Sequence, residues 1–565
     1  MEFSSVDTIW ILLGAILVFF MQSGFAMVEV GLTRNKNTGN LVMKNLMDFC
    51  IGSLAFWFVG FGLMFAGTGP LIGGLDFFFQ GNYDGKFGNF PGYAFLIFQT
   101  VFCGTSATII SGAMAERTKF SAYCLYSLLM SLIIYPVSGH WIWGGGWLAG
   151  LGFHDFAGST AVHMVGGIAA LTGAKILGPR IGKYDVNGVS RAIPGQSLSL
   201  AALGVFILWF AWFGFNGCST VSATGNDTIM SMSAIMVTTN LAAAAGALAC
   251  MLLTWAAYGR PDVSMTLNGA LGGLVGITAG CDAVTPAGAV IIGLVSGIVL
   301  NYGIEFVDKR LRIDDPVGAF GVHGVCGAVG TILTGLLAVD GGLLYGGGAG
   351  MLLTQILGVI SVAAWVAVTM TIVFTVLDRL VGLRVSPGEE INGLDIEEHG
   401  IVSDYPGFMA DGGHTSIIGA GAAPAAIPDY PPEAAGAGRE AAKPAAAAKL
   451  TRVDIITRPE KFAELKAALH AAGITGMTVT KVMGCGVQRG ISEYYRGVEV
   501  AANMLPKICV EIVISKVPAR AVIEAAKKVL HTGRIGDGKI FVYDVENVVK
   551  VRTGEEGYDA LQYTS

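Results

Sequence analysis

Eleven apolar stretches, each about 18 residues or longer, are the feature that most limits what this chain can fold into. They lie near residues 8–31, 41–67, 92–115, 120–138, 158–178, 196–217, 228–258, 263–280, 286–306, 317–339 and 348–378. A helix needs about 20 mostly apolar residues to cross the roughly 30 Å hydrocarbon core of a membrane. Lipid offers the backbone no hydrogen-bond partners, so these stretches predict an α-helical polytopic membrane protein with 11 transmembrane helices.

The charge content changes near residue 385. Residues 1–385 contain 16 Lys or Arg and 18 Asp or Glu, whereas the remaining 180 residues contain 19 and 23. The first part therefore has the composition of a membrane protein and the second that of a soluble protein. A net charge of −6 provides no basic surface, so we expect no nucleic-acid partner.

Basic residues in the loops predict the orientation in the membrane. With the N-terminus outside, the inward loops carry fifteen Lys or Arg, among them Arg34, Arg117 and Arg180, whereas the outward loops carry only Lys86. Lys and Arg concentrate in cytoplasmic loops. We therefore expect the soluble C-terminal part in the cytoplasm. The N-terminal segment has no basic region, so we interpret the first stretch as a retained helix and not as a signal peptide.

Two segments 160 residues apart resemble each other. DFAGSTAVHMVGG (155–167) and DPVGAFGVHGVCG (315–327) coincide at six positions. They belong to the fifth and tenth apolar stretches, so the two copies run through the membrane in opposite directions. This pattern predicts an inverted 5+5 repeat, with a substrate path near the midplane where the repeats meet.

The repeat places His163 and His323 at equivalent positions, roughly 12 Å inside the membrane from opposite faces. Ionisable residues at this depth usually line a polar path, although either ring alone could be a neutral core histidine bonded to a backbone carbonyl or a hydroxyl. Symmetry would bring the two rings together. Adjacent imidazoles can share a proton but cannot both carry charge cheaply, so a paired and largely neutral proton relay is the functional interpretation.

Several motifs in the first part resemble the ammonium transporter (Amt/Mep/Rh) family over essentially all of residues 1–400. They are DFAGSTAVHMVGGIAALTGAKILGPR (155–180), FQTVF (98–102), HWIWGGGW (140–147), WFGFNG (212–217), GVHGVCG (321–327) and GLDIEEHG (393–400). The resemblance implies a homotrimeric transporter of the plasma membrane, not an enzyme, that needs no cofactor for transport.

By this resemblance the external recruitment site uses Trp143, Phe102 and Ser219, with Asp155 close by, and the gate is Phe102 stacked on Phe215. His163 and His323 would line the pore. Ammonium suits these residue types, because an indole face attracts cations and a hydroxyl accepts a hydrogen bond from N–H. Full dehydration of the ion is costly. The family's solution is implied to be deprotonation outside, followed by passage of ammonia with or without the proton.

The cytoplasmic part begins with a linker. Residues 401–450 are rich in Ala, Pro and Gly and show no apolar periodicity, which is typical of a flexible linker. From residue 451 the pattern of strand, helix and strand occurs twice, the last strand being KIFVYDVENVVKVR (539–552). Two βαβ units predict an α/β ferredoxin-like domain at 451–565.

Two glycine clusters, at 484–490 and 532–539, predict turns whose backbone N–H groups could bind phosphate, with Lys539 and Arg552 nearby. The segments GITGMTVTKVMGCG, EYYRGVE, LPKICVEIVI and TGRIGDGKIFVYDVENVVKVRTGEEG resemble the PII signal-transduction proteins over 451–560. The resemblance implies regulatory ATP or ADP binding by Thr478, Gly484, Gly486, Gln488, Glu511, Gly536, Asp537, Gly538, Lys539 and Arg552. It also implies 2-oxoglutarate near Gln488 and Lys507, Mg²⁺ at Gln488, and an effector loop, 486–504, in which Arg496 would plug the transporter pore.

The chain departs from the common PII pattern at several positions. Val500 stands where many PII proteins carry a modifiable tyrosine, which excludes uridylylation there. Val487 and Lys550 replace arginines that are common around the nucleotide, and Arg489 replaces a lysine. Nucleotide preference is therefore less constrained than nucleotide binding.

Together the resemblances predict an ammonium transporter regulated in cis by a PII domain that senses ATP, ADP and 2-oxoglutarate. One alternative is an ammonium sensor with little net transport and a signalling output from the PII domain. A second is a neutral-gas channel of the Rh kind, against which Trp143 and Ser219 favour cation recruitment. A third is a C-terminal domain that binds metal or only trimerises, against which Gln488, Lys507 and Lys539 favour nucleotide binding.

Overall fold

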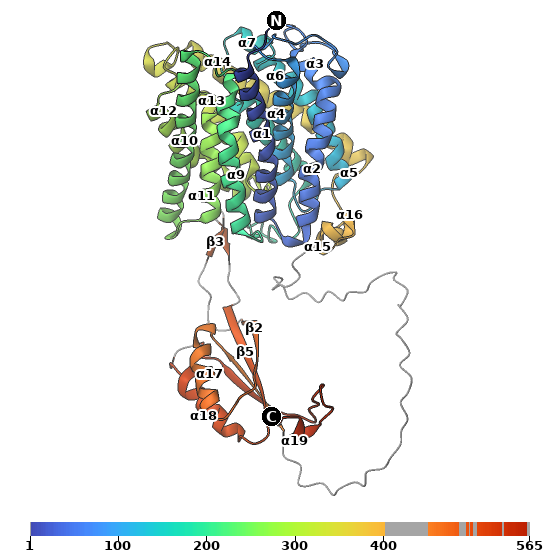
Figure 1. Ribbon diagram of the computed structural model, residues 1–565, viewed down its shortest axis with the longest axis vertical. Helices are drawn as coiled ribbons and strands as arrows, with labels where there is room; N and C mark the ends of the chain where they lie inside the picture. The colour runs from blue at the N-terminus through green and yellow to red at the C-terminus, as the bar shows by residue number, and fades with distance from the viewer. Residues whose placement is uncertain are drawn as a thin grey trace. The chain divides into compact units, whose positions relative to one another are not determined.

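The computed structural model of the protein describes residues 2–401, 450–484, 493–495, 498–500, 505–533 and 536–561. These residues form a helical unit, which ends at residue 401, and an α/β unit nearer the C-terminus (Figure 1). Each unit is built around its own hydrophobic core.

Ten helices in the described part of the chain are long and apolar enough to cross a membrane, and α11 (Val263–Ile277) is a shorter apolar helix. The long spans are α1 (Ser5–Leu32), α2 (Thr38–Ala55) continuing through η2 (Phe56–Gly60) into α3 (Phe61–Phe65), α4 (Gly92–Ala113), α5 (Phe120–Leu129) continuing through η4 (Met130–Ile134) into α6 (Tyr135–Ile142), η5 (Ser159–Met164) with α8 (Val165–Leu177), α9 (Leu198–Gly217), α10 (Asn226–Tyr258), α12 (Pro286–Glu305) with η7 (Phe306–Leu311), η8 (Phe320–Val325) with α13 (Cys326–Leu337), and α14 (Gly350–Leu380). Each predicted stretch therefore corresponds to one helix, and the helical membrane fold is confirmed.

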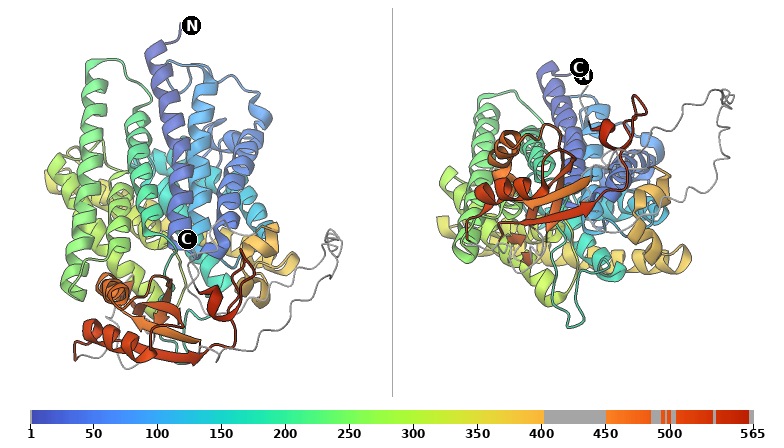
Figure 2. Two further views of the ribbon diagram at one scale, coloured as in Figure 1. Left: turned by 60° about the horizontal axis from the view of Figure 1, so that its bottom comes forward. Right: turned by 90° about the horizontal axis from the view of Figure 1, so that it is seen from below.

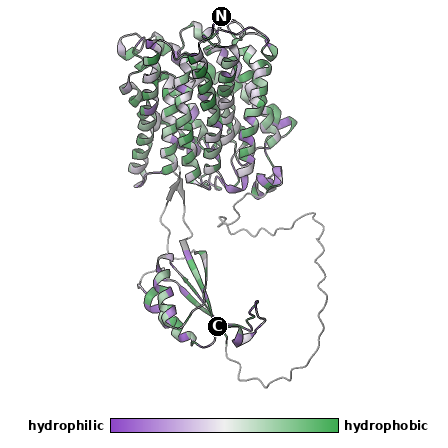
Figure 3. Cartoon of the chain, in the orientation of Figure 1, coloured by the Kyte–Doolittle hydropathy of each residue, from purple (hydrophilic) through white to green (hydrophobic). Residues whose placement is uncertain are grey.

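Hydrophobic residues run along the helices of this unit, which stand side by side (Figures 1 and 3). Many large apolar side chains are exposed on the outward helix faces, as in Phe206 and Phe210 of α9 and Leu353 and Ile360 of α14. Such faces are stable against lipid and unfavourable in water.

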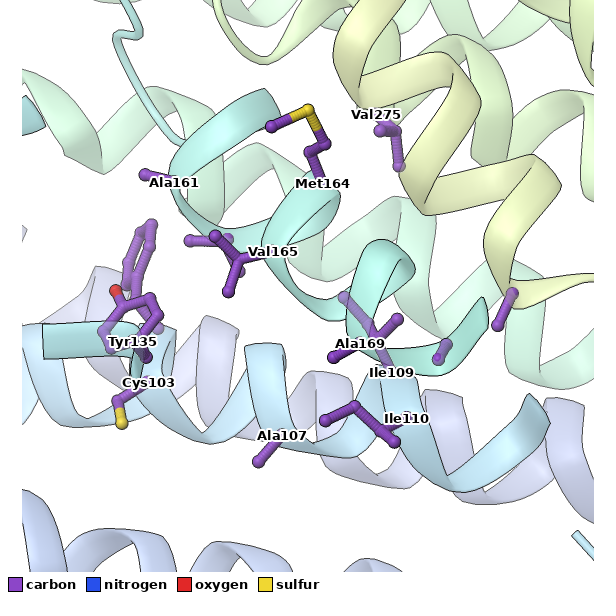
Figure 4. Packing of buried hydrophobic residues seen from close by; sticks show 14 of the residues in the cluster. Cys103, Ala107, Ile109, Ile110, Tyr135, Ala161, Met164, Val165, Ala169 and Val275 are labelled. Carbon is purple, nitrogen blue, oxygen red and sulfur yellow. The ribbon is translucent and has the colours of Figure 1, made fainter. Parts of the chain in front are cut away.

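Glycines allow the helices to pack closely. A Cβ on Gly31 of α1 would lie 2.4 Å from the backbone nitrogen of Ala201 in α9. Where the two repeats cross, a Cβ on Gly167 would lie 2.2 Å from the backbone nitrogen of Gly324. Small residues at these contacts let backbones approach as they do in other membrane bundles. Figure 4 shows the neighbouring contact, where α8 crosses α4 beside Ile109.

Short helices complete the unit. They are η1 (Asn35–Asn37), η3 (Phe77–Phe79), α7 (Trp147–Gly150), η6 (Cys218–Thr220), η9 (Leu343–Tyr345), α15 (Pro387–Asn392) and α16 (Leu394–His399). Helix α15 starts with a capping box in which Ser386 and Glu389 bond each other's backbone. Asp395 of α16 accepts hydrogen bonds from the backbone nitrogens of Gly39 and Asn40, which holds the segment against the start of α2.

The α/β unit contains a four-stranded antiparallel sheet in the order β2-β5-β1-β6. Its elements are β1 (Thr451–Thr457), η11 (Pro459–Lys461), α17 (Phe462–Ala471), β2 (Thr478–Gly484), β5 (Leu505–Ile514), α18 (Ala519–Leu530), β6 (Lys539–Asp544) and a final turn α19 (Gly557–Ala560). A two-stranded sheet of β3 (Glu493–Tyr495) and β4 (Val498–Val500) is separate from this four-stranded sheet. Helices α17 and α18 pack together on one side of the sheet (Figures 1 and 2). This is the predicted ferredoxin-like arrangement.

The last strand is shorter than the sequence predicts. We expect a strand over 539–552, whereas β6 ends at Asp544. Within the described residues β6 pairs with β1, whose first residue, Thr451, lies opposite Asp544, and the backbone N–H of Val545 still donates to the carbonyl oxygen of Leu450. After Val545 the described chain leaves this ladder despite its β-branched residues.

Candidate functional site

Both halves of the repeat begin with the same acidic turn. The carboxylate of Asp155 accepts four hydrogen bonds from the backbone nitrogens of residues 158–161, at 2.8–3.0 Å. Asp315 accepts three, from residues 318–320, at 2.9–3.0 Å. Gly158 and Gly318 have φ values of 113° and 80°, which disfavour any side chain. These turns start the π-helical segments η5 and η8 that carry the two histidines.

The two histidines of the repeat meet inside the bundle. Nδ1 of His163 lies 3.3 Å from Nδ1 of His323, and the ring centroids are 5.2 Å apart. The exposed fraction is 0% for His163 and 5% for His323. The ring of His163 stacks on Trp212 with an interplanar angle of 20°, and Phe25 lies 5.9 Å from His323. Trp212 and Phe25 therefore pack against the two imidazole rings, and the Nδ1 atoms make the close contact between these rings.

Two phenylalanines lie beside this pair. The ring centroids of Phe102 and Phe215 are 4.2 Å apart with an interplanar angle of 30°, and both side chains are buried. Phe215 also lies 5.2 Å from the ring of His163. The stacked phenylalanines and the histidines therefore form one continuous column of buried rings.

A cavity of about 190 Å³ opens on the Phe102 side of this column. Trp143, Phe102 and Ser219 line it together with Gln99 and Phe156. The ring of Trp143 meets Phe102 edge to face at 6.1 Å. The hydroxyl of Ser219 donates to the carbonyl oxygen of Phe215, which leaves its lone pairs able to accept a hydrogen bond. The predicted recruitment residues thus share one aromatic cavity.

Asp155 does not line this cavity but holds Trp143, which does. Its carboxylate is occupied by the backbone of η5, and its carbonyl oxygen accepts a hydrogen bond of 2.7 Å from Nε1 of Trp143. The side chain is 4% exposed. Asp155 therefore fixes both the indole and the start of the histidine segment.

The loops contain an ion-pair network that no sequence motif indicates. Arg180 bonds both oxygens of Asp314 and one oxygen of Glu116, which also pairs with Arg34. Burial alone raises the pKa of Asp314, but the charges of Arg180 and Arg117 lower it far below its usual range. Burial likewise raises the pKa of Glu116. The charges of Arg180 and Arg34 together have the larger effect, so the pKa of Glu116 is lowered overall. The network ties together the loops that follow α1, α4, α8 and α12.

The α/β unit brings several predicted ligand residues together. Nζ of Lys507 in β5 donates to the carbonyl oxygen of Gly536 at 3.2 Å, and Nε of Arg458 donates to the same oxygen at 3.1 Å. The side chain of Asp537 accepts hydrogen bonds from the hydroxyl and backbone N–H of Thr532, which lower its pKa. A Cβ on Gly538 would lie 2.0 Å from the carbonyl oxygen of Ile456, so only glycine fits.

The remaining predicted residues of this unit are more spread out. Lys539 starts β6 opposite Ile456, and Thr478 of β2 lies opposite Glu511 of β5. Gly484 ends β2, whereas Arg552 lies on an exposed turn. Gly486, Gln488 and Arg496 lie outside the described residues, as does most of the linker 401–450.

Comparisons with known proteins agree on both parts of the chain. Residues 9–403 match the family model of the Ammonium Transporter Family, and residues 450–555 match that of the nitrogen regulatory protein P-II. Ammonium transporter Amt2 of Archaeoglobus fulgidus is 47% identical over 427 residues, which cover 72% of this chain and 89% of that protein. Ammonium transporter Amt1 of Haloferax mediterranei is 40% identical, covering 74% and 83%.

Solved structures give the same result for the helical unit. A protein described as a sensor Amt protein aligns with a TM-score of 0.65 and 40% identity, covering 70% of this chain and 98% of that one. Mep2 of Candida albicans aligns with a TM-score of 0.64 and 31% identity, covering 69% and 88%.

Proposed function

The chain belongs to the ammonium transporter family and carries a P-II domain, and from this membership we propose that it moves ammonium inward through the twin-histidine column under control of its own P-II domain. The observation that carries the proposal is the continuous arrangement of an aromatic cavity, two stacked phenylalanines and two touching, buried imidazoles.

In this mechanism ammonium enters the cavity as a cation. The faces of Trp143 and Phe102 attract its charge, and the oxygen of Ser219 accepts one N–H. Beyond Phe102 the path is apolar and buried, so crossing as an ion would cost most of its hydration energy. The ion therefore loses its proton before the gate, and uncharged ammonia passes the rings of Phe215 and His163.

The histidine pair holds ammonia in a dry passage. Each neutral imidazole offers one N–H and one lone pair, so the pair matches a molecule that both donates and accepts hydrogen bonds. Two charged rings with their Nδ1 atoms 3.3 Å apart would repel strongly, which keeps the pair at one shared proton or none. The column thus favours ammonia over metal cations, which cannot lose charge in this way.

The C-terminal domain acts as the regulator on the cytoplasmic side, in an orientation with the N-terminus outside. Residues 401–450 tether domain 451–565 to the membrane domain 1–400, and the transporter and its regulator assemble as a trimer. A tethered regulator has a high effective concentration for its own pore. Binding of ATP or ADP, with Mg²⁺ and 2-oxoglutarate, reshapes loop 486–504, and Arg496 then closes or frees the exit.

Transport is tested with the purified full chain in liposomes, by imposing an ammonium gradient and recording uptake and current. We expect both to exceed those of empty liposomes and both to fall when His163 and His323 are replaced by Ala. Regulation is tested on the same sample by adding ADP, or ATP with 2-oxoglutarate, on the side of the C-terminal domain. Equal flux in all ligand states would contradict the regulatory part.

A second candidate is an ammonium sensor with little net flux. The similarity to a solved sensor Amt protein, of which this chain covers 98% at 40% identity, favours it. The same liposomes distinguish the two functions, because a sensor binds ammonium without sustained uptake. Uptake and net charge measured together separate both from a neutral-gas channel, which shows uptake without current.

A further inference from the structure

Asp48 is a buried carboxyl group in the middle of α2 that the pore does not use. Its side chain is 0% exposed. The hydroxyl of Tyr123 in α5 donates to Oδ2 at 2.5 Å, whereas Oδ1 has no hydrogen-bond partner among the described residues. An unpartnered carboxylate oxygen in a dry interior is costly. The geometry therefore calls for a ligand that donates hydrogen to Oδ1, and a proton or a water molecule is small enough to do so.

A second buried carboxyl group lies on the neighbouring helix α1. Glu29 accepts hydrogen bonds from Ser111 of α4 at 2.8 Å and from Nδ2 of Asn45 at 3.1 Å. Asn45 is one turn before Asp48 on α2, and its Oδ1 is also without a partner in the part of the chain that the structure describes. Two acceptor oxygens on the same face of α2 are thus left open.

The charged groups around Asp48 lie on several elements. Lys44 of α2 donates from Nζ to the carbonyl oxygen of Thr118, and Nζ lies 5.6 Å above the ring of Tyr123. Lys44 interacts with Glu29, Glu398 and Arg117, whereas the charged group that acts on Asp48 is Glu29 of α1. Two carboxyl groups close together in a dry interior cannot both carry charge cheaply, and uptake of one proton removes their repulsion.

Hydroxyl groups continue from Asp48 along the seam between α2 and the span formed by α5, η4 and α6. Tyr126, Ser127, Ser131 and Tyr135 are buried on this span, and their hydroxyls show no partner among the residues placed by the structure. Ser127, Ser131 and Tyr135 follow Tyr123 at intervals of four residues, which favours one helix face, whereas Tyr126 packs against Phe374 of α14.

Contacts across the seam show that this face points at α2. Tyr123 bonds Asp48, a Cβ on Gly52 would lie 3.0 Å from Oγ of Ser131, and the ring of Tyr135 lies 6.4 Å from Phe56. The seam thus pairs successive turns of α2 with a row of hydroxyls. Buried polar atoms in such a row are normally satisfied by ordered water.

Helix α4 separates this seam from the ammonia column. Phe102 of α4 stacks on Phe215 in the gate, whereas the next residue, Cys103, directs its Sγ to the carbonyl oxygen of Ser131 at 3.8 Å. Figure 4 shows Cys103 of α4 next to Tyr135 of α6. The seam and the column therefore contact α4 through different residues, Cys103 for the seam and Phe102 for the column.

We propose that Asp48 binds and releases a proton inside the membrane, and that the hydroxyls of this seam, with water, conduct that proton separately from ammonia. The inference rests on the proposed function, because ammonium that crosses as ammonia leaves one proton behind. Ammonium dissociates into ammonia and a proton, and the proton adds to the carboxylate of Asp48 to form the acid. Release of the proton to cytoplasmic water restores the carboxylate, with no other bond changed.

The test measures charge moved per methylammonium taken up, by the full chain in liposomes, from radiolabelled uptake and membrane current on the same preparation. Asp48→Asn keeps the size of the side chain and removes the titrating oxygen. We expect the charge per methylammonium to fall about tenfold. The matched control is Ser296→Ala, which removes another buried hydroxyl, on α12 and outside the seam, and should leave the ratio unchanged.

An unchanged ratio in Asp48→Asn would overturn the proposal, as would an equal fall in the control. If Asp48→Asn does not reach the liposomes, Tyr123→Phe and Ser131→Ala replace it, because both retain most of the packing. They should lower the ratio and shift the pH at half-maximal current, and a wild-type ratio and pH profile in both would equally contradict the path. Absence of any uptake by the wild type would instead refute the proposed transport function.

Discussion

Nδ1 of His163 and Nδ1 of His323 lie 3.3 Å apart, although 160 residues separate them in the chain. Only one hydrogen fits between two nitrogens at this distance, so one Nδ1 donates and the other accepts. The tautomer of one ring then determines that of the other. Nε2 of His163 has no partner among the described side and main chains, so it is available to a molecule in the column.

We expect substitution of one ring to uncouple this pair. In His323→Ala, His163 loses its only ring-nitrogen contact within the described structure and gains room to hydrate. Ammonium uptake should fall by about tenfold, the equivalent of about 1.4 kcal/mol on the barrier. The measurement is initial uptake in liposomes between pH 5 and 8. An unaltered rate and pH profile would show that the pair is only packing.

The acidic turns should matter for folding more than for recruitment. Asp155→Asn replaces one acceptor oxygen by an NH₂ group that faces two backbone N–H donors. Loss of charge-assisted bonds predicts a cost of about 3 kcal/mol or more in the free energy of unfolding. Asp315→Asn is the matched variant and should also destabilise the protein, because Asp315 accepts the equivalent backbone bonds at the start of η8. Thermal unfolding of both variants in detergent gives the comparison, and equal stability to wild type would contradict it.

Much of this architecture is predictable from the sequence because the forces that produce it are local. Apolar stretches of about 20 residues form transmembrane helices, because lipid offers the backbone no other hydrogen-bond partners. The repeated spacing of Asp, Gly and His predicts the turn that begins each copy of the repeat. Trp212, which stacks on His163, is not predictable in this way, because it is one aromatic residue in an apolar helix. The hydrogen bond between Tyr123 and Asp48 is also not predictable from the sequence, because it depends on how α2 and α5 pack.

Opening the gate should reduce selectivity. Phe215→Ala removes one of two rings stacked at 4.2 Å and exposes His163 to the cavity side. Water then enters the column, and the cost of moving a hydrated cation falls. We expect the ratio of ammonium to potassium current to drop by about tenfold, roughly 1.4 kcal/mol. Phe206→Ala, an exposed position on the same helix, is the control and should keep the ratio. A gate variant that discriminates like wild type would exclude the gating role.

The loop network predicts how stability depends on pH. The pKa of Asp314 and of Glu116 is lowered in the folded state, so their contribution is complete above the unfolded value near pH 4. It is lost as the pH falls through the lower folded values. We expect stability to stay level from neutral pH to about 4 and then decrease.

Arg180→Gln breaks the same network and leaves two buried carboxylates short of a partner. The expected cost at neutral pH is about 3–5 kcal/mol. The variant should lose less further stability below pH 4 than wild type, because the carboxyl groups already protonate more easily. Melting temperatures of both proteins across pH 3–7 provide the measurement, and parallel curves would contradict the assignment.

Nucleotide binding should depend on the turn before β6. Lys539→Ala removes a charge next to Gly538. Loss of one charge-assisted contact, about 1.5–3 kcal/mol, predicts an affinity for ATP that is weaker by roughly 10- to 150-fold. Lys528→Ala on the exposed face of α18 removes the same charge elsewhere and should bind normally. Calorimetric titration of the full chain compares them. Equal affinities in both variants would exclude Lys539 from the site.

The most direct measurement is uptake and current from one preparation of the full chain in liposomes, under equal gradients of ammonium and of potassium. We expect the ammonium gradient to drive uptake with a current that potassium does not produce, and we expect nucleotide and 2-oxoglutarate on the side of the C-terminal domain to change its size. Ammonium uptake and current no greater than those of empty liposomes, in every ligand state, would contradict transport through the twin-histidine column.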